Sequence, residues 1–157
     1  MSENKIDFKG ISEAINKRKQ EKKEEVKVAR EFLMRLLLMH NVKEVVVGFD
    51  GSCDSGSIER FEYQGVKEIK GDEIVLGTLK TKTEWCNKKQ EFVTSTKEST
   101  LNDMVEEVCY DLLEISHGGW EINEGSYGEF LIEPKEDKIS LTFNRRFESV
   151  ETSEEEF

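Results

Sequence analysis

The stretch VKEVVVGF, residues 42–49, predicts the clearest β-strand of this chain. Its three consecutive valines leave little alternation between apolar and polar residues, so both faces of the strand are expected to be partly covered. A long helical pattern precedes the strand, across the short link at Asn41, and an unusual segment rich in Asp, Ser and Gly follows it at residues 50–59. The strand therefore predicts where the folded core begins.

Residues 8–40 predict a long helix, because apolar residues recur there at steps of three and four. Residues 16–25 are almost wholly charged or polar, and Lys/Glu mixtures of this kind favour helix. Only the second half has an apolar face wide enough to dock on a core. The first half, with Phe8, Ile11 and Ile15, is expected to project or to meet a partner.

A second helix is predicted at residues 99–116. Ser99 or Thr100 can cap its start together with Asp103, and Gly118-Gly119 ends it. One apolar face includes Cys109, which is therefore expected to be a buried thiol.

The remaining patterns predict strands at residues 58–63, 65–70, 73–82, 127–133 and 138–147, whereas residues 80–98 are ambiguous. Short links and turn signals favour an α+β fold: a mainly antiparallel sheet of about five or six strands with two helices packed on one face, in the order α-β-β-β-α-β-β. We divide the chain into a long N-terminal helix (1–41), an α+β core (42–147) and an acidic tail (148–157) that is expected to be disordered.

The charge of the chain is uneven. Residues 1–40 carry 10 Lys and Arg against 7 Asp and Glu, whereas residues 41–157 carry 13 against 27, a net charge of −14. An acidic body argues against direct nucleic-acid binding and favours either simple solubility or a protein partner with a basic surface. The three cysteines lack paired spacing, and no apolar run reaches membrane-spanning length, so we expect a cytoplasmic protein that does not enter a membrane.

Residues 50–59, DGSCDSGSIE, form the first candidate site. Asp50, Ser52 and Asp54 alternate as oxygen ligands do in a calcium loop, and Glu59 follows. Ser55 stands where an EF-hand requires glycine, and Phe61 where it requires a bidentate Glu, so an EF-hand is excluded. Two readings remain: a turn in which side-chain oxygens cap backbone amides, or a divalent-cation loop using Asp50, Asp54 and Glu59.

Residues 118–130, GGWEINEGSYGEF, form the second candidate site. Four glycines permit a shaped loop, and its aromatic and acidic side chains suit recognition of a partner or ligand. The alternative is that the aromatic residues anchor the core while the carboxylates face water. If the two segments converge, their acidic residues would form a carboxylate cluster. The candidate binding residues in this loop are Trp120, Glu121, Asn123, Glu124 and Tyr127.

These two segments resemble an uncharacterised bacterial, plasmid and phage family that pairs a DGSxDSGxIE-type stretch with a later GWEINxGSxGEF-type stretch. The resemblance covers roughly residues 42–147. It brings no activity with it, and it implies a mobile-element or accessory setting.

Three functions follow as hypotheses. No phosphate loop, dinucleotide fingerprint, HExxH motif or nucleophile elbow is visible, so we favour a non-enzymatic protein-binding accessory or inhibitor-type protein, with no cofactor. The first alternative is a divalent-metal-binding protein or metal-dependent enzyme that uses the loop at 50–59. The second is an acidic mimic of nucleic acid.

Overall fold

The fold is taken from a computed structural model that describes residues 7–156, apart from the side chains of residues 78–80 and 82. Within these residues two helices and six strands are present. The predicted α+β class, with antiparallel strands and two helices, is confirmed. The six strands form two separate sheets, one of four strands and one of two.

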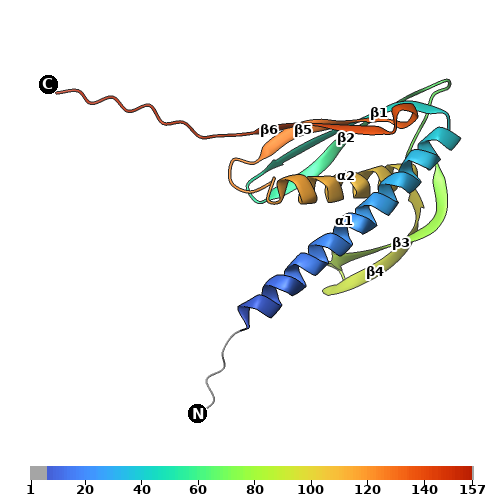
Figure 1. The fold of residues 1–157 in the computed structure, drawn as a ribbon, viewed down its shortest axis with the longest axis horizontal. Coiled ribbons are helices and arrows are strands. Elements are labelled where there is room, and N and C mark those ends of the chain that lie inside the picture. The colour runs from blue at the N-terminus through green and yellow to red at the C-terminus, as the bar shows by residue number, and fades with distance from the viewer. Residues whose placement is uncertain (1–6, 157) are drawn as a thin grey trace, which may run out of the picture.

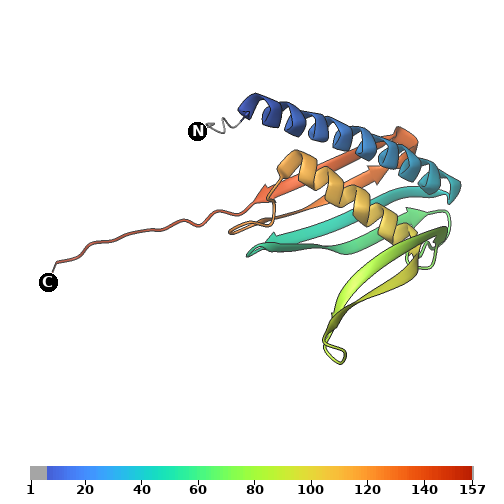
Figure 2. The same ribbon diagram turned by 90° about the horizontal axis from the view of Figure 1, so that it is seen from below.

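The four-stranded sheet carries the core. Its strand order is β2-β1-β5-β6, and every neighbouring pair is antiparallel. Both helices lie on one face of this sheet (Figures 1 and 2). A short 3-10 turn at Pro134–Glu136 connects β5 to β6. The strands span Val42–Ser52 (β1), Ser55–Gly65 (β2), Ser126–Glu133 (β5) and Lys138–Arg145 (β6).

The first helix, α1, spans Phe8–Met39, close to the predicted range. Its buried residues are Val26, Leu33, Met34, Leu36 and Leu37, so only the second half packs against the body. The first half extends away from the sheet (Figure 1). Stability of the helix as a whole therefore depends on its second half, since packing of an apolar face contributes more than propensity.

The second helix, α2, spans Leu101–His117 and begins with a capping box. The Thr100 hydroxyl accepts a hydrogen bond from the Asp103 amide, and the Asp103 carboxylate accepts one from the Thr100 amide. Of the two caps that the sequence offered, Thr100 is the one used. Cys109 is fully buried, as its place on the apolar face predicted.

The strand β1 alternates between fully and partly buried residues. Val45, Val47 and Phe49 point into the core, whereas Val46 and Gly48 lie on the outer, half-covered face. The core joins these inward side chains to the apolar faces of both helices and to Phe130 and Ile132 of β5. Neither of the described helices covers the outer face of the sheet (Figure 1).

The remaining strands, β3 (Val75–Cys86) and β4 (Glu91–Thr100), pair with each other as a ribbon that extends from the body (Figure 2). The ambiguous residues 80–98 belong to this ribbon. The predicted strand at residues 65–70 is wrong: residues 66–70 contain bends and unassigned backbone, and β2 ends at Gly65. Trp85 and Phe92 are exposed on the ribbon and contact each other edge to face, with ring centroids 5.1 Å apart.

Beyond β6, residues 146–156 have neither helix nor strand and lead away from the body (Figure 1). None of the described helices is long and apolar enough to cross a membrane.

Candidate functional site

The two segments singled out in the sequence lie side by side. Residues 50–59 form the tip of the β1–β2 hairpin, in which Ser52 pairs with Ser55 across a two-residue turn. The turn residues Cys53 and Asp54 both have positive φ, 52° and 65°, as a type I′ hairpin turn requires. Their amides donate to carbonyl oxygens of the second segment: Cys53 to Asn123 at 3.0 Å and Asp54 to Glu121 at 3.2 Å.

Trp120 fixes this junction from the inside. Its side chain is only 6% exposed and meets Phe49 edge to face at 5.5 Å between ring centroids. The indole lies against Gly51 and Gly56, where an added Cβ would approach it within 3 Å. The glycines of the DGSCDSGSIE segment therefore make room for a tryptophan. This is the core-anchor reading of Trp120.

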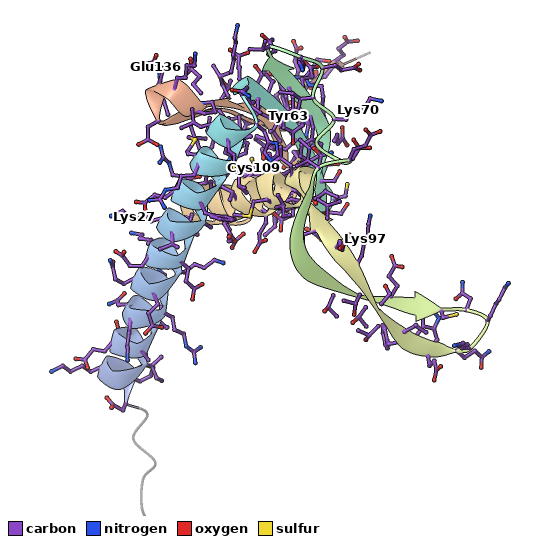
Figure 3. The ribbon with its side chains drawn as sticks, turned by 90° about the vertical axis from the view of Figure 1, so that its right-hand side faces the viewer. Lys27, Tyr63, Lys70, Lys97, Cys109 and Glu136 are labelled. Atoms are coloured by element: carbon purple, nitrogen blue, oxygen red, sulfur yellow. The ribbon has the colours of Figure 1, made fainter. Side chains whose placement is uncertain are left out.

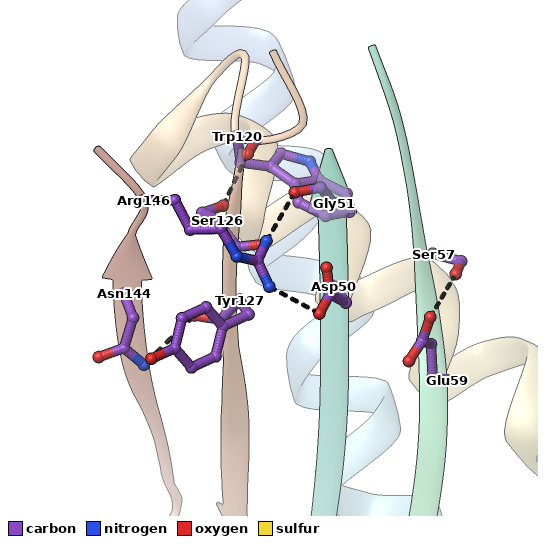
Figure 4. Close-up of polar contacts among 9 residues, drawn as sticks. All are labelled: Asp50, Gly51, Ser57, Glu59, Trp120, Ser126, Tyr127, Asn144 and Arg146. Atoms are coloured by element: carbon purple, nitrogen blue, oxygen red, sulfur yellow. Dashed lines mark hydrogen bonds and ion pairs between the residues drawn. The ribbon is translucent and has the colours of Figure 1, made fainter. Parts of the chain in front are cut away.

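Arg146 joins the two segments from the C-terminal side (Figure 4). Its guanidinium donates to the Asp50 carboxylate at 2.8 Å and to the carbonyl oxygens of Gly51 and Ser126 at 3.1 and 3.3 Å. It also lies over the Tyr127 ring, 4.7 Å from the centroid. The hydrogen bond to Asp50 raises the pKa of Arg146.

The role of Arg146 was not predicted from the sequence. It follows the last strand by one residue, and no spacing relates it to Asp50, 96 positions earlier. Only the register of β1 with β5 and of β5 with β6 brings the two residues together.

Asp50 opens onto a shallow hollow of about 480 Å³ on the outer face of the sheet. Gly48 lies in its floor, and Tyr127 and Asn144 line it from β5 and β6. Of the charged groups that line this hollow, Asp50 pairs with Arg146, and Arg60 contacts Glu129 at 2.9 Å and, outside the hollow, Glu62 at 3.3 Å. Such a surface can make hydrogen bonds but offers no enclosed volume for a substrate.

The other predicted site residues are placed separately. Ser52, Asp54 and Ser55 are exposed at the hairpin tip, and the Glu59 carboxylate accepts a hydrogen bond from Ser57 at 3.5 Å (Figure 4). Within residues 7–156, no group of three or more His, Cys, Asp or Glu side chains could hold a metal ion, so Asp50, Asp54 and Glu59 do not form one.

In the second segment, Asn123 has a positive φ of 59°, and Asn123 and Glu124 are both exposed. One carboxylate oxygen of Glu121 is buried without a hydrogen-bond partner. Both segments therefore contact each other mainly through backbone atoms and Trp120.

A different surface is left uncovered on α1. We call residues 8–21 the free half of α1; Figure 3 shows this part of the helix leaving the body on one side and the β3–β4 ribbon leaving it on another. Phe8, Ile11 and Ile15 are 73%, 49% and 47% exposed. The sequence singled out these three residues, but they lie outside the predicted binding set at residues 50–59 and 120–127.

The comparisons with known proteins identify a family. Searches of the curated proteins and of the solved structures found no match. A family model described as a family of unknown function (DUF6878) matches residues 26–157. The match begins at Val26, the first buried residue of α1, so the free half lies outside it. Since the match covers most of the sequence, the chain belongs to this family of unknown function, DUF6878.

Proposed function

We propose that this protein is a non-enzymatic, protein-binding accessory or inhibitor-type protein that engages its partner through the free half of α1. The observation that carries the proposal is an exposed apolar group at the free end of α1, on the same side of the helix as the residues that dock on the core. Phe8 and Ile15 are seven residues apart and lie in line with Val26 and Leu33, with the charged residues 16–25 between the two groups.

The exposed part of this face is large enough to contribute to binding. Full burial of one large aliphatic or aromatic side chain is worth roughly 1.5–3 kcal/mol, and about half to three quarters of each of the three side chains is exposed, so together they offer about 2.5–5 kcal/mol before the costs of association. Helices of this kind bind in grooves through anchors at i, i+3 and i+7, which is the spacing of Phe8, Ile11 and Ile15.

The two segments at residues 50–59 and 119–130 support a structural role over a catalytic one. The Asp50 carboxylate is bound by Arg146, and the amides of the hairpin tip are bound by carbonyl oxygens. An accessory role in a bacterium, plasmid or phage is supported by the resemblance of these segments to that class of proteins. A cytoplasmic location is supported by the three cysteines, all of which are free.

Site-specific photo-crosslinking tests the proposal. A photoreactive amino acid is placed at residue 15 of the full chain, in the cells that naturally make it, and at residue 20 as the matched control. Residue 20 is five positions along the helix and therefore about 140° away from the apolar face. We expect a discrete protein adduct from residue 15 that is absent from residue 20, and that disappears when Ile11→Asp is added.

The adduct is then identified by mass spectrometry. The same partner from independent cultures supports the proposal. No adduct at residue 15, or equal adducts at residues 15 and 20, would refute it.

A further inference from the structure

We infer that the segment of the partner that binds the free half of α1 is an amphipathic α-helix whose apolar stripe is flanked by acidic side chains. This inference rests on the proposed function and adds the chemistry of the partner to it. It is argued from the charges beside the apolar stripe and from the helix that already covers the same face further along α1.

The apolar stripe of the free half is followed by basic residues. Arg18 and Lys19 follow Ile15 by three and four residues, which places them on the same side of the helix, and Lys22 follows by seven. Lys23 lies at the edge of this side. The exposed surface is thus apolar at residues 8–15 and positively charged at the C-terminal end of the same stripe.

Most acidic residues of the same segment face elsewhere. Glu13 and Glu24 lie nearly opposite the stripe, two residues before Ile15 and nine after it. Glu21 is turned away from the stripe and pairs with Lys17 at 3.9 Å. Glu25 and Asp111 compensate Lys22, so the positive charge left open for a partner beside the stripe is that of Arg18 and Lys19.

The helix α2 already packs against the same side of α1, next to the free half, and shows which kind of helix binds there. It packs against α1 with an apolar stripe that includes Val108, and its Asp111 meets the basic end of the stripe of α1. Lys22 Nζ donates a hydrogen bond to Asp111 Oδ1 at 2.9 Å, which raises the pKa of Lys22, and the nearby charges of Glu25 and Glu107 raise it further. At the last turn before the free half, the chain itself pairs an acidic helix with this face.

Two other occupants are less favoured by charge. A second copy of the chain that paired its own free half here in parallel would bring Arg18, Lys19 and Lys23 of both copies together, which is repulsive; an antiparallel copy would separate them, and sedimentation distinguishes it. The chain's own tail carries five glutamates at residues 148–157, but Phe147 and Val150 are 82% and 81% exposed and do not contact the helix.

Peptide binding to the full-length protein tests the inference. The probe is a synthetic peptide of residues 101–117 with Cys109→Ser, which is acidic and amphipathic; the matched probe carries lysine in place of Glu106, Glu107, Asp111 and Glu114. Fluorescence anisotropy at about 50 mM salt measures both. We expect the acidic peptide to bind at least tenfold more tightly than the lysine peptide, with affinity falling as salt rises.

Variants locate the binding. Ile15→Asp should weaken the acidic peptide at least tenfold, whereas Gln20→Asp, which adds the same charge on the far side of the helix, should change its affinity less than threefold. Both residues are exposed, so neither variant is expected to unfold the protein.

Equal affinity for the two peptides, or binding that is unaffected by Ile15→Asp, would overturn the inference. A dimer in sedimentation that Ile15→Asp dissolves would assign the face to a second copy, and a tenfold gain on deleting residues 148–157 would assign it to the tail. Either result also overturns the inference. A crosslinked partner at residue 15 without acidic preference refutes only the inference, whereas loss of the crosslink refutes the proposed function itself.

Discussion

Replacing Gly56 by alanine tests how tightly Trp120 is held at the hairpin tip. The new Cβ would lie 2.6 Å from Cζ3 of Trp120, and closer still to Cη2. The indole cannot move away easily, because it is buried and contacts Phe49 edge to face. Overpacking of this kind costs about 1–3 kcal/mol of the free energy of unfolding.

A double-mutant cycle separates this clash from any other effect of the alanine. Trp120→Phe removes the outer edge of the indole and alone costs about 1–2 kcal/mol in lost apolar burial and cavity formation. In the double variant the methyl of Ala at position 56 occupies part of that cavity. We therefore expect a favourable coupling of at least about 1 kcal/mol.

Urea unfolding at 25 °C, followed by circular dichroism, measures all four proteins of the cycle. Gly48→Ala is the matched control, because Gly48 lies on the opposite face of β1 and its Cβ would meet Arg60 at an ordinary 3.4 Å. Gly48→Ala should combine with Trp120→Phe additively to within about 0.5 kcal/mol. Equally additive behaviour of Gly56→Ala with Trp120→Phe would refute the packing argument.

Three further predictions concern the helices. Thr100→Ala should cost about 1 kcal/mol in urea unfolding, because it breaks the capping box with Asp103; an unchanged midpoint would show that the cap contributes nothing. Leu33→Ala should lower the free energy of unfolding by about 2–5 kcal/mol, whereas Ile15→Ala on the same helix face should change it by no more than about 0.5 kcal/mol. Equal losses would mean that the free half is docked in solution. Burial raises the pKa of Cys109 from 9.0 to about 12, so the thiol's contribution to stability is complete below pH 9 and is lost as pH rises toward 12. Measured by urea unfolding from pH 8 to 11, the free energy of unfolding should therefore fall more steeply for the natural protein than for Cys109→Ala, by up to about 1.4 kcal/mol per pH unit.

Both helices could be predicted from the sequence because their signals are local. The 3.6-residue recurrence of apolar residues and the Thr100–Asp103 spacing lie within single turns of helix, and α1 and α2 follow them closely. The exposure of Phe8, Ile11 and Ile15 was also foreseen, because the charged residues 16–25 separate them from the docking face.

The division into two sheets could not be predicted, because it depends on long-range pairing. Nothing local to β1 indicates that its second neighbour is β5, or that Trp85 and Phe92 cover each other on an exposed ribbon. The same holds for the candidate site. Arg146 reaches Asp50 only through two strand registers, and Trp120 explains the glycines at 51 and 56 only once the hairpin tip is folded onto the loop.

The strand order β2-β1-β5-β6 has a consequence for synthesis of the chain. Val45 pairs with Ile132, 87 residues later, so β1 can complete only one of its two edges, with β2, while the ribbon and α2 are still being made. At roughly 5–20 residues per second on the ribosome, that edge stays open for about 4–17 s. During this interval a valine-rich strand is available to other nascent chains, so the yield of soluble protein should depend on translation speed between β2 and β5.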